Sequence, residues 1–326
     1  MNRILGFVVL LALSACAWTQ RYEITRVEGP RGAVSWGTYV SDINDLGQVV
    51  GVWRKFGGYD RAFIWENGVA TDLGGFGGNG THAVAINNAG TVVGNSRDVH
   101  GVRLAFVWTK EGGMKRLFPS RSSTWATGIN EAGDVVGSGY GGAFLVSDGV
   151  TTVLPLRFPN GQSYTADIND IGEIVGGDFQ YQGETPYPTL WIKGVNFGLP
   201  GGGFAWPMRI NNNGQIAGYT GFWGSLGEPV TWINRQIIYL PMLAYGGQAL
   251  DIDENGLIVG YLHDESYRSR AVVWRNLQIS NLNNRALKAA GWHLISAHAI
   301  NERGQIIGRG SFKGSYPSYL LTPVSR

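Results

Sequence analysis

The sequence of 326 residues contains a single cysteine, Cys16, and only 15% of its residues are charged. One cysteine excludes intramolecular disulfides and any metal site built from several thiolates. Lysine and arginine are scattered and the net charge is +2, so the chain has no basic stripe of the kind that binds nucleic acid. We therefore expect no nucleic-acid partner, and a fold that is stabilised mainly by buried apolar area.

Long apolar runs are also scarce, and the exception lies at the N-terminus. Arg3 precedes an apolar run over residues 4–13, which is too short to span a bilayer and is typical of a signal peptide. We predict a signal peptide over residues 1–15. Leu13-Ser14-Ala15-Cys16 resembles the lipobox of bacterial lipoproteins, which implies a lipidated Cys16 and a membrane-anchored protein in the periplasm or at the cell surface. An ordinary secretory signal is the alternative, and both interpretations predict export.

What the sequence has in abundance is repetition. The stretch over residues 43–51, Ile-Asn-Asp-Leu-Gly-Gln-Val-Val-Gly, is the first of seven related copies. The copies begin at Ile43-Asn44, Ile86-Asn87, Ile129-Asn130, Ile168-Asn169, Ile210-Asn211, Ile252-Asp253 and Ile300-Asn301. Their intervals of 39 to 48 residues, with β-type patterning, are typical of propeller blades. The 50 glycines and 12 tryptophans fit short strands, tight turns and aromatic packing.

Each repeat contains four short segments with strand patterning. Examples are residues 81–86 before the second Ile-Asn pair, residues 91–94 after it, and residues 62–65 and 69–73, which flank an Asn-Gly turn. Four consecutive antiparallel strands make one blade. We therefore predict an all-β fold, a seven-bladed β-propeller of four-stranded antiparallel blades, as a single domain over residues 16–326.

Each of the seven blades has four strands only if the first and the last strand of the chain belong to the same blade. Residues 22–27 precede the first complete blade, and residues 318–323 end the last blade without a fourth strand. We expect these two segments to pair and to close the ring. The longest interval contains residues 283–291, whose composition predicts a short helical insertion over 283–290.

The box Ile-Asn-x-x-Gly-x-Val-Val-Gly, followed by Ala-Phe-x-Trp, resembles the HAF repeats, a family of predicted extracellular bacterial repeats. The resemblance covers residues 21–324. The histidine of that family's His-Ala-Phe triplet is absent, because Arg61, Leu104 and Gly142 stand at its position. The resemblance implies an exported repeat protein and very little about activity.

The Asn or Asp after each repeated isoleucine predicts an Asx turn, with the glycine three residues later in the left-handed conformation. Calcium is the alternative in one copy, because the sequence from Asp251 through Asp253 to Gly256 matches the first half of a calcium loop. Leu262 stands where such a loop needs its bidentate acid. Asp251 and Asp253 are thus the candidate metal ligands, and no other cofactor is predicted.

The expected strand order places short, repetitive turns on one face and connections of variable length on the other, where binding sites commonly lie. Four residues before each repeated isoleucine, at the channel mouth on the variable face, most residues are aromatic or histidine. The candidate ligand-binding residues are Tyr39, His82, Trp125, Tyr164 and Trp206 in this register, with Trp53 and Trp223 in variable segments. Alternatively, strict strand alternation puts these rings on the same side as the buried isoleucine, wedged between blades.

These observations predict a monomeric envelope binding module that recognises a glycan or an extracellular protein and touches the membrane only through a lipid anchor. Exposed aromatic rings stack on sugars, and the sequence contains neither His-Glu-x-x-His nor Gly-x-Ser-x-Gly. One alternative is a polysaccharide lyase or hydrolase, and another is a structural envelope component. The candidate catalytic carboxylates are Asp60, Asp98, Asp178, Glu184, Asp264 and Glu265.

Overall fold

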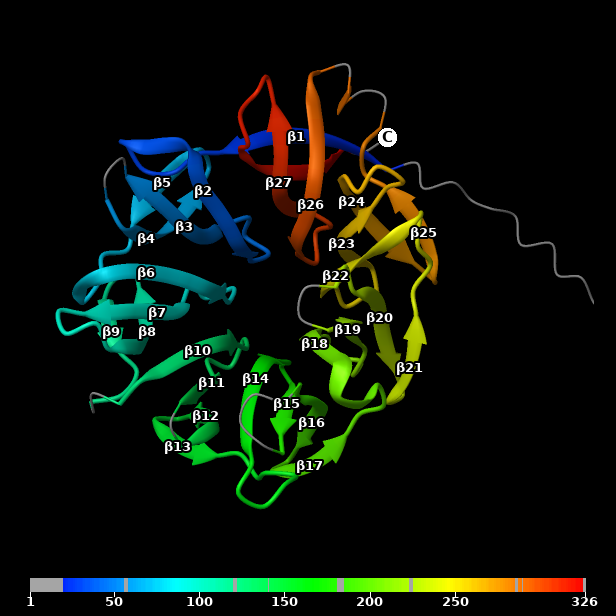
Figure 1. Ribbon diagram of the computed structural model, residues 1–326. Helices are drawn as coiled ribbons and strands as arrows, with labels where there is room; N and C mark the ends of the chain where they lie inside the picture. The colour runs from blue at the N-terminus through cyan, green and yellow to red at the C-terminus, as the bar shows by residue number, and fades with distance from the viewer. Residues whose placement is uncertain are drawn as a thin grey trace, which may run out of the picture.

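Seven four-stranded antiparallel sheets surround one central axis in the computed structural model (Figure 1). The structure describes residues 20–55, 58–119, 122–139, 141–180, 185–222, 225–284, 287–288 and 290–324. The predicted signal peptide over residues 1–15 and the predicted lipidation site, Cys16, lie outside these residues. The chain is therefore a seven-bladed β-propeller, as the repeats predict.

Each sheet is one blade, whose strands follow one another from the axis to the rim (Figure 1). The innermost strands are β2 (Ala33–Ile43), β6 (Gly77–Ile86), β10 (Thr124–Ile129), β14 (Gln162–Ile168), β18 (Ala205–Ile210), β22 (Tyr245–Ile252) and β26 (Trp292–Ile300). The second strands are β3 (Val49–Lys55), β7 (Val92–Asp98), β11 (Val135–Gly139), β15 (Ile174–Phe179), β19 (Ile216–Thr220), β23 (Ile258–His263) and β27 (Ile306–Phe312). The third strands are β4 (Asp60–Glu66), β8 (Arg103–Thr109), β12 (Gly142–Ser147), β16 (Tyr187–Ile192), β20 (Glu228–Ile233), β24 (Ser269–Arg275) and β28 (Ser318–Val324). The outermost strands are β5 (Val69–Asp72), β9 (Gly113–Arg116), β13 (Val150–Val153), β17 (Val195–Gly198), β21 (Gln236–Tyr239), β25 (Gln278–Asn281) and β1 (Arg21–Val27).

The last blade is completed by the first strand of the chain. β1 pairs antiparallel with β28, with Tyr22 opposite Pro323 and Val27 opposite Ser318. The predicted closure is confirmed residue for residue, and β28 is not left as an exposed sheet edge.

In the part of the chain that the structure describes, two short helical segments lie in the connections between blades. η1 (Gly202–Phe204) is a 3-10 turn that leads into β18. Leu287 and Lys288 are helical, and the side chain of Asn284 accepts the Leu287 N–H at 2.9 Å, as an N-cap does. These residues fall within the predicted insertion, of which residues 285, 286 and 289 lie outside the described part of the chain.

The repeated Asx residue closes the turn between the first two strands of each blade, as predicted. Asn44 Oδ1 accepts the N–H groups of Leu46 and Gln48 at 3.1 and 2.9 Å, and Gly47 has a φ of 80°. Asp253 fills the same role, because its Oδ1 accepts the Leu257 N–H at 2.7 Å.

The same asparagines also tie each blade to the next. Asn44 Nδ2 donates to the carbonyl oxygen of Asn87 in the neighbouring blade at 3.0 Å. Six such bonds, of 2.8 to 3.3 Å, join Asn44 to Asn87, Asn87 to Asn130, Asn130 to Asn169, Asn169 to Asn211, Asn211 to Asp253, and Asn301 to Asn44. Asp253 has no side-chain N–H and cannot donate the seventh bond to the last blade.

The residue after each Asx forms a second ring, and this ring is complete. Each backbone N–H donates to a side-chain oxygen of the equivalent residue in the next blade, at 2.8 to 3.1 Å. The members are Asp45, Asn88, Glu131, Asp170, Asn212, Glu254 and Glu302. Five are acids. Burial raises the pKa of Glu302, which reaches about 7, against the hydrogen bond from the Glu254 N–H; the nearby charges of Asp253, Glu254 and Asp45 also raise it.

Every innermost strand also carries a β-bulge at the same place, two residues before the repeated isoleucine. In β2 the pairing with β3 shifts between Val40 and Asp42, which leaves Ser41 as the extra residue. The bulge explains the last glycine of the box. A Cβ on Gly51 would lie 2.0 Å from the carbonyl oxygen of Tyr39, and the other six equivalent glycines meet a carbonyl oxygen at 2.0 to 2.2 Å.

The hydrophobic core is divided among the spaces between blades. Val50 and Ile64 of the first blade pack with Ile86 and Phe106 of the second, and similar clusters fill the other spaces. Tryptophans in the third strands add hydrogen bonds between blades. The indole N–H groups of Trp191, Trp232 and Trp274 donate to the carbonyl oxygens of Pro155, Pro200 and Pro241 at 2.8 to 2.9 Å.

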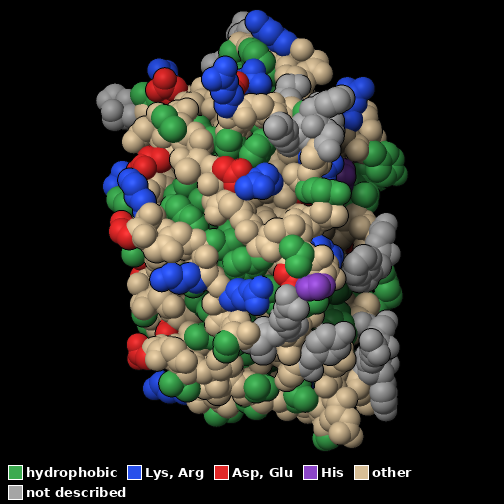
Figure 2. Space-filling model, turned by 90° about the vertical axis from the view of Figure 1, so that its left-hand side faces the viewer, with side chains coloured by type: hydrophobic (Ala, Val, Ile, Leu, Met, Phe, Trp, Pro, Cys, Tyr) green, Lys and Arg blue, Asp and Glu red, His purple; other side chains and the backbone are tan. Residues whose placement is uncertain are grey.

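On the side of the molecule that Figure 2 presents, basic and acidic side chains are interspersed and form no large region of one sign. This distribution agrees with the scattered charges of the sequence. In the part of the chain that the structure describes, no helix is long and apolar enough to cross a membrane.

The missing seventh bond predicts that Asp253→Asn stabilises the protein. The new amide can donate to the carbonyl of Asn301, and it replaces a carboxylate whose pKa is raised by burial. We expect a gain of about 1 kcal/mol in the free energy of unfolding, measured in urea. Asn87→Ala, which removes a turn bond and a bond between blades, should cost about 2 kcal/mol. A loss of stability in Asp253→Asn would contradict the role of the ring.

Glu302→Gln tests the crowding of acids in the second ring, since glutamine can still accept the Glu254 N–H. The folded protein raises the pKa of Glu302 from 4.5 to about 7, so ionised Glu302 destabilises the fold progressively between pH 4.5 and 7. We expect Glu302→Gln to leave the urea midpoint unchanged at pH 4.5 and to raise it at pH 8. Glu111→Gln, on the exposed turn before β9, is the control. An effect of equal size at both pH values would contradict the assignment.

Candidate functional site

A large pocket opens on the variable face, where the innermost strands of three successive blades begin. Its volume is about 1140 Å³. The walls come from the starts of β10, β14 and β18, from the turn between β11 and β12, and from the connection between β13 and β14. The larger and polar side chains of its lining include Arg103, Ser123, Trp125, Asn160, Gln162, Tyr164, Phe179 and Trp206.

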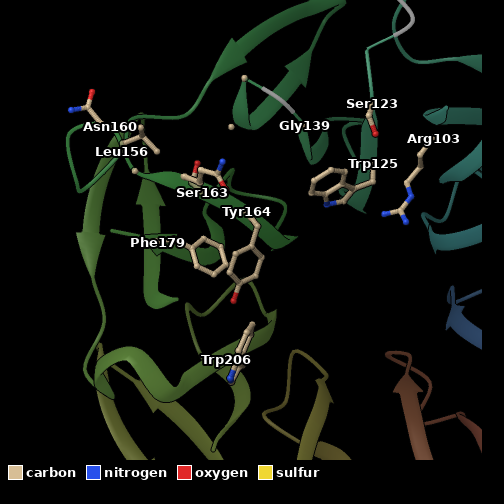
Figure 3. Close-up of a pocket in the computed structure, with 14 residues that line it drawn as sticks. Arg103, Ser123, Trp125, Gly139, Leu156, Asn160, Ser163, Tyr164, Phe179 and Trp206 are labelled. Atoms are coloured by element: carbon tan, nitrogen blue, oxygen red, sulfur yellow. The ribbon is translucent and has the colours of Figure 1, made fainter. Parts of the chain in front are cut away.

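Three of the predicted aromatic residues meet in this pocket. Trp125, Tyr164 and Trp206 stand near the starts of three successive innermost strands, and all are partly exposed (Figure 3). The ring of Tyr164 lies 5.7 Å from that of Phe179 and 6.1 Å from that of Trp206, measured between centroids. Trp206 Nε1 donates to the carbonyl of Gly221 at 3.3 Å, which fixes the orientation of the indole.

The bulge explains why these rings reach the pocket. Trp125 pairs with Ser138, and Ile129 pairs with Val135. Ser138 and Val135 are three residues apart, so Trp125 and Ile129 lie on opposite faces of the sheet. The alternative interpretation assumed strict alternation, and the extra residue reverses it, so these rings lie on the face opposite the repeated isoleucine. The wedging between blades that it also expected is found at Tyr164, whose ring contacts Trp206 of the next blade and whose hydroxyl oxygen is buried.

The remaining predicted ligand-binding residues lie elsewhere. Tyr39 is 37% exposed, and the guanidinium of Arg309 lies 4.5 Å from its ring centroid. Trp53 is only 5% exposed and belongs to the core between the last and first blades. His82 lines two neighbouring cavities instead. Trp223 lies outside the described residues.

The candidate catalytic carboxylates do not converge. Among the described residues that line the large pocket, none is Asp, Glu or His. Asp98 and Asp178 are buried in the second and fourth blades. Asp98 accepts the N–H groups of His100 and Val102 in its own turn, and Asp178 accepts hydrogen bonds from Thr189 and Asn196. Asp60 lies in the first blade, and Glu184 lies outside the described residues.

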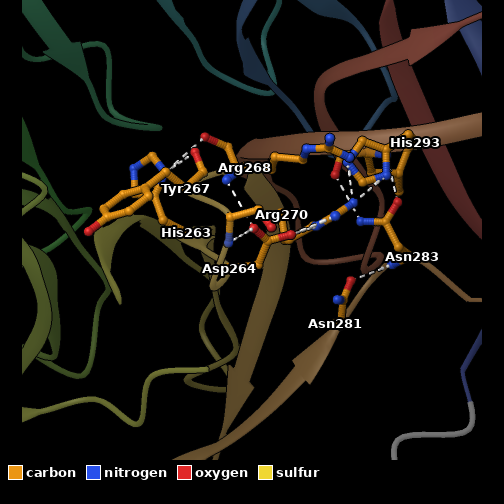
Figure 4. A network of polar contacts seen from close by, with 11 residues as sticks. His263, Asp264, Tyr267, Arg268, Arg270, Asn281, Asn283 and His293 are labelled. Carbon is orange, nitrogen blue, oxygen red and sulfur yellow. Dashed lines mark hydrogen bonds and ion pairs between the residues drawn. The ribbon is translucent and has the colours of Figure 1, made fainter. Parts of the chain in front are cut away.

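Asp264 belongs to a separate polar network on the sixth blade (Figure 4). It accepts the backbone N–H groups of Ser266 and Arg268, and the guanidinium of Arg270 at 2.6 and 2.8 Å. The backbone bond from Arg268 and the contact with Arg270 lower the pKa of Asp264 to about 2. Asp264 is therefore ionised at neutral pH and is a poor proton donor. The neighbouring Glu265 is exposed.

Charged side chains also meet around the central axis. Arg209 Nε lies 3.7 Å from Asp251 Oδ1, and Asp42 and Asp167 contribute further negative charge. Each of these carboxylates accepts the N–H of the isoleucine in the next blade at 2.8 to 3.0 Å. Burial raises the pKa of all three, that of Asp251 to about 8, while Arg209 lowers it.

The two candidate calcium ligands therefore have protein partners. Asp251 is bonded to two backbone N–H groups and lies beside Arg209, while Asp253 closes its turn. In the described ranges, no three or more His, Cys, Asp or Glu residues are arranged to hold a metal ion.

No family model matches the chain, and no curated protein matches its sequence. Among solved structures, the fold resembles the β-propeller domain of the Trilobed protease from Pyrococcus furiosus, with 11% identity and a TM-score of 0.59 over 87% of this chain and 93% of that one. That domain is described as an open velcro topology, whereas β1 closes the ring here.

Two further structures share the fold. A puromycin-hydrolyzing peptidase from Mycobacterium tuberculosis is 12% identical, with a TM-score of 0.58 over 90% of this chain and 54% of that one. An oligogalacturonate lyase in complex with manganese is 12% identical, with a TM-score of 0.53 over 94% and 97%. At these identities the comparisons define the class, a β-propeller, and leave the ligand to be argued from the site.

Arg209→Gln tests the charge balance at the axis. Removing the cation leaves three buried carboxyl groups without it, of which Asp251, with a pKa of about 8, is mostly protonated at pH 7. We expect a loss of about 3 kcal/mol at pH 7. The loss should be smaller at pH 5, where more of the carboxylates are protonated. Arg61→Gln is the control, because it breaks an exposed pair with Asp72 and should cost less than about 1 kcal/mol. An equal loss in both variants by urea unfolding would contradict this account.

Proposed function

We propose that this β-propeller is a binding protein for a polysaccharide or oligosaccharide, which it holds in the pocket on the variable face. One observation carries the proposal, namely that Trp125, Tyr164 and Trp206 from three successive blades present partly exposed rings to one open pocket. Sugar rings have apolar faces that pack on aromatic side chains, and such platforms contribute large contact areas with little loss of side-chain entropy.

The polar groups and the size of the pocket support the same ligand class. Ser123, Asn160 and Gln162 also line the pocket and supply donors and acceptors for hydroxyl groups. A volume of about 1140 Å³ exceeds that of most small-molecule sites, which range from about 300 to 1,000 Å³. It suits several linked sugar residues better than one small molecule.

The lining of the pocket supports binding of a saccharide without catalysis. Hydrolysis or elimination on a sugar needs positioned acids and bases. The described lining of the pocket offers no carboxylate and no imidazole, and burial raises the pKa of its one phenol, Tyr164. The candidate carboxylates are distributed over several blades. An extracellular protein partner is the alternative, and no feature of the pocket favours it over a saccharide.

We also propose that the protein is exported, is anchored through Cys16 and belongs with the HAF repeats. The support is the sequence alone, from the apolar run over residues 4–13, the lipobox-like tetrapeptide and the seven boxes. The mass of the mature N-terminal peptide from a native membrane fraction tests the first two points, since an unmodified Cys16 would overturn the anchor.

The proposed site predicts that Trp125→Ala abolishes most saccharide binding and leaves the fold intact. Removing one stacking ring should weaken affinity about tenfold or more. The measurement is titration calorimetry against the tightest ligand in a panel of neutral and acidic polysaccharides. Tyr239→Ala is the matched control, because Tyr239 is 58% exposed on β21, outside the pocket. Failure of every saccharide to bind the unmodified protein would overturn the proposal.

A further inference from the structure

Positively charged side chains gather beside the aromatic pocket, in two smaller cavities of about 430 and 320 Å³. Arg97, Arg103 and His82 line the larger cavity. Arg54, Asp60 and His82 line the smaller one. Among the described residues that line these two cavities, three arginines therefore face one carboxylate, that of Asp60, in a protein whose charges are otherwise scattered and balanced.

Two of these arginines oppose each other directly. Arg97 on β7 and Arg103 on β8 are cross-strand partners, and both are exposed. Like charges at such positions destabilise a sheet. Arg97 Nη1 donates to the Gly101 carbonyl at 2.8 Å. No ion pair between described residues includes Arg97 or Arg103. An anion between the two guanidinium groups would remove this repulsion.

His82 completes the group from the neighbouring strand. It pairs with Asn95, two positions from Arg97, so both side chains lie on the same face of the sheet. Its Nε2 lies 3.8 Å from Asp60 Oδ2, and Asp60 is already bonded to Arg54 Nε at 2.6 Å. Burial lowers the pKa of His82, and the three arginines lower it further against the opposing effect of Asp60. The imidazole is therefore placed to respond to a charge that binds in these cavities.

Arg103 connects this group to the aromatic pocket. It lines both cavities, and its guanidinium carbon lies 5.9 Å from the ring centroid of Trp125. In Figure 3, Arg103 lies on the side of Trp125 away from Tyr164. A sugar residue stacked on Trp125 can therefore direct a substituent toward Arg103 and Arg97.

We propose that Arg97, Arg103 and His82 form an anion subsite, which binds the carboxylate of an acidic saccharide held in the aromatic pocket. The inference rests on the proposed glycan-binding function and adds the class of glycan, a polymer that contains uronic acids. Arginine suits this role because its planar guanidinium matches a carboxylate with two parallel hydrogen bonds. Binding to the exposed arginines should weaken as salt concentration rises.

The anion subsite is tested first without a saccharide, with inorganic sulfate as the probe. Proton NMR follows the pKa of His82, assigned by loss of its resonance in His82→Gln, as sulfate replaces chloride at constant ionic strength. We expect sulfate to raise the pKa of His82, because a bound anion stabilises the imidazolium. Arg97→Gln should abolish the response. Arg116→Gln, which removes the same charge from exposed β9 in the same blade, should keep it. An unchanged pKa of His82 overturns the subsite.

Two matched hexasaccharides then test the class of glycan, β-1,4-linked glucose and β-1,4-linked glucuronic acid, which differ only at carbon 6. We expect the acidic hexamer to bind at least about tenfold more tightly, and Arg97→Gln to remove most of the difference. Equal binding of the two hexamers overturns the acidic-glycan inference and leaves the glycan-binding function in place. If neither hexamer nor any other saccharide binds while sulfate still acts on His82, the glycan function fails and the anion subsite stands.

Discussion

Adjacent blades depend on one asparagine that serves two purposes at once. Its Oδ1 closes the turn of its own blade, and its Nδ2 reaches the carbonyl of the equivalent asparagine in the next blade, as Asn44 does toward Asn87. The turn can therefore not move without disturbing its neighbour. The repeat lengths nonetheless vary from 39 to 48 residues. Much of this variation falls in the connections on the opposite face, such as the helical turn at Leu287 and Lys288, so one face is held constant while the other is free to diverge.

The β-bulge has the same importance for the site as the asparagine has for the ring. It forces a glycine such as Gly137 opposite the carbonyl of Trp125, where a Cβ would approach to 2.2 Å. It also reverses which side of the strand faces the pocket. The bulge also places charged side chains near the axis, because Arg209 and Asp251 directly follow it in their strands. One local irregularity, repeated in seven strands, thus sets both the aromatic lining and the axial charges.

The sequence was sufficient for features that depend on local pattern. Strand order followed from the hairpin signals, and the pairing of Tyr22 with Pro323 followed from counting strands. The bulge could not be predicted, because the sequence around an extra residue such as Ser41 does not differ from that of a regular strand. The bond from Asn44 to Asn87 was missed for a related reason, since an asparagine in a turn gives no sign of a second partner.

The candidate site shows the same division. The register that contains Trp125 and Tyr164 was visible, but the loops that leave these rings open to solvent were not. Trp53 was also predicted as an aromatic residue of the variable face, yet it lies in the core. The acids of the variable face could be identified from the sequence, but the distances between them could not. Asp60, Asp98, Asp178 and Asp264 each have a partner within their own blade. The arginine group beside His82 was not predicted, because it arises from the cross-strand pairing of β7 and β8.

The closure of the ring by β1 also determines how the molecule is oriented on any surface to which its N-terminus is attached. β1 begins at Arg21, opposite Val324, at the face where Gln305 of the last short turn contacts Thr322. A chain that precedes Arg21 therefore enters from the face of short turns, opposite the aromatic pocket. Four residues separate Cys16 from Arg21, so five Cα–Cα steps join them, a reach of at most about 18 Å. With a lipid on Cys16, the bilayer would lie beneath the face of short turns. The pocket would then point outward, toward polymers that approach from the surrounding medium.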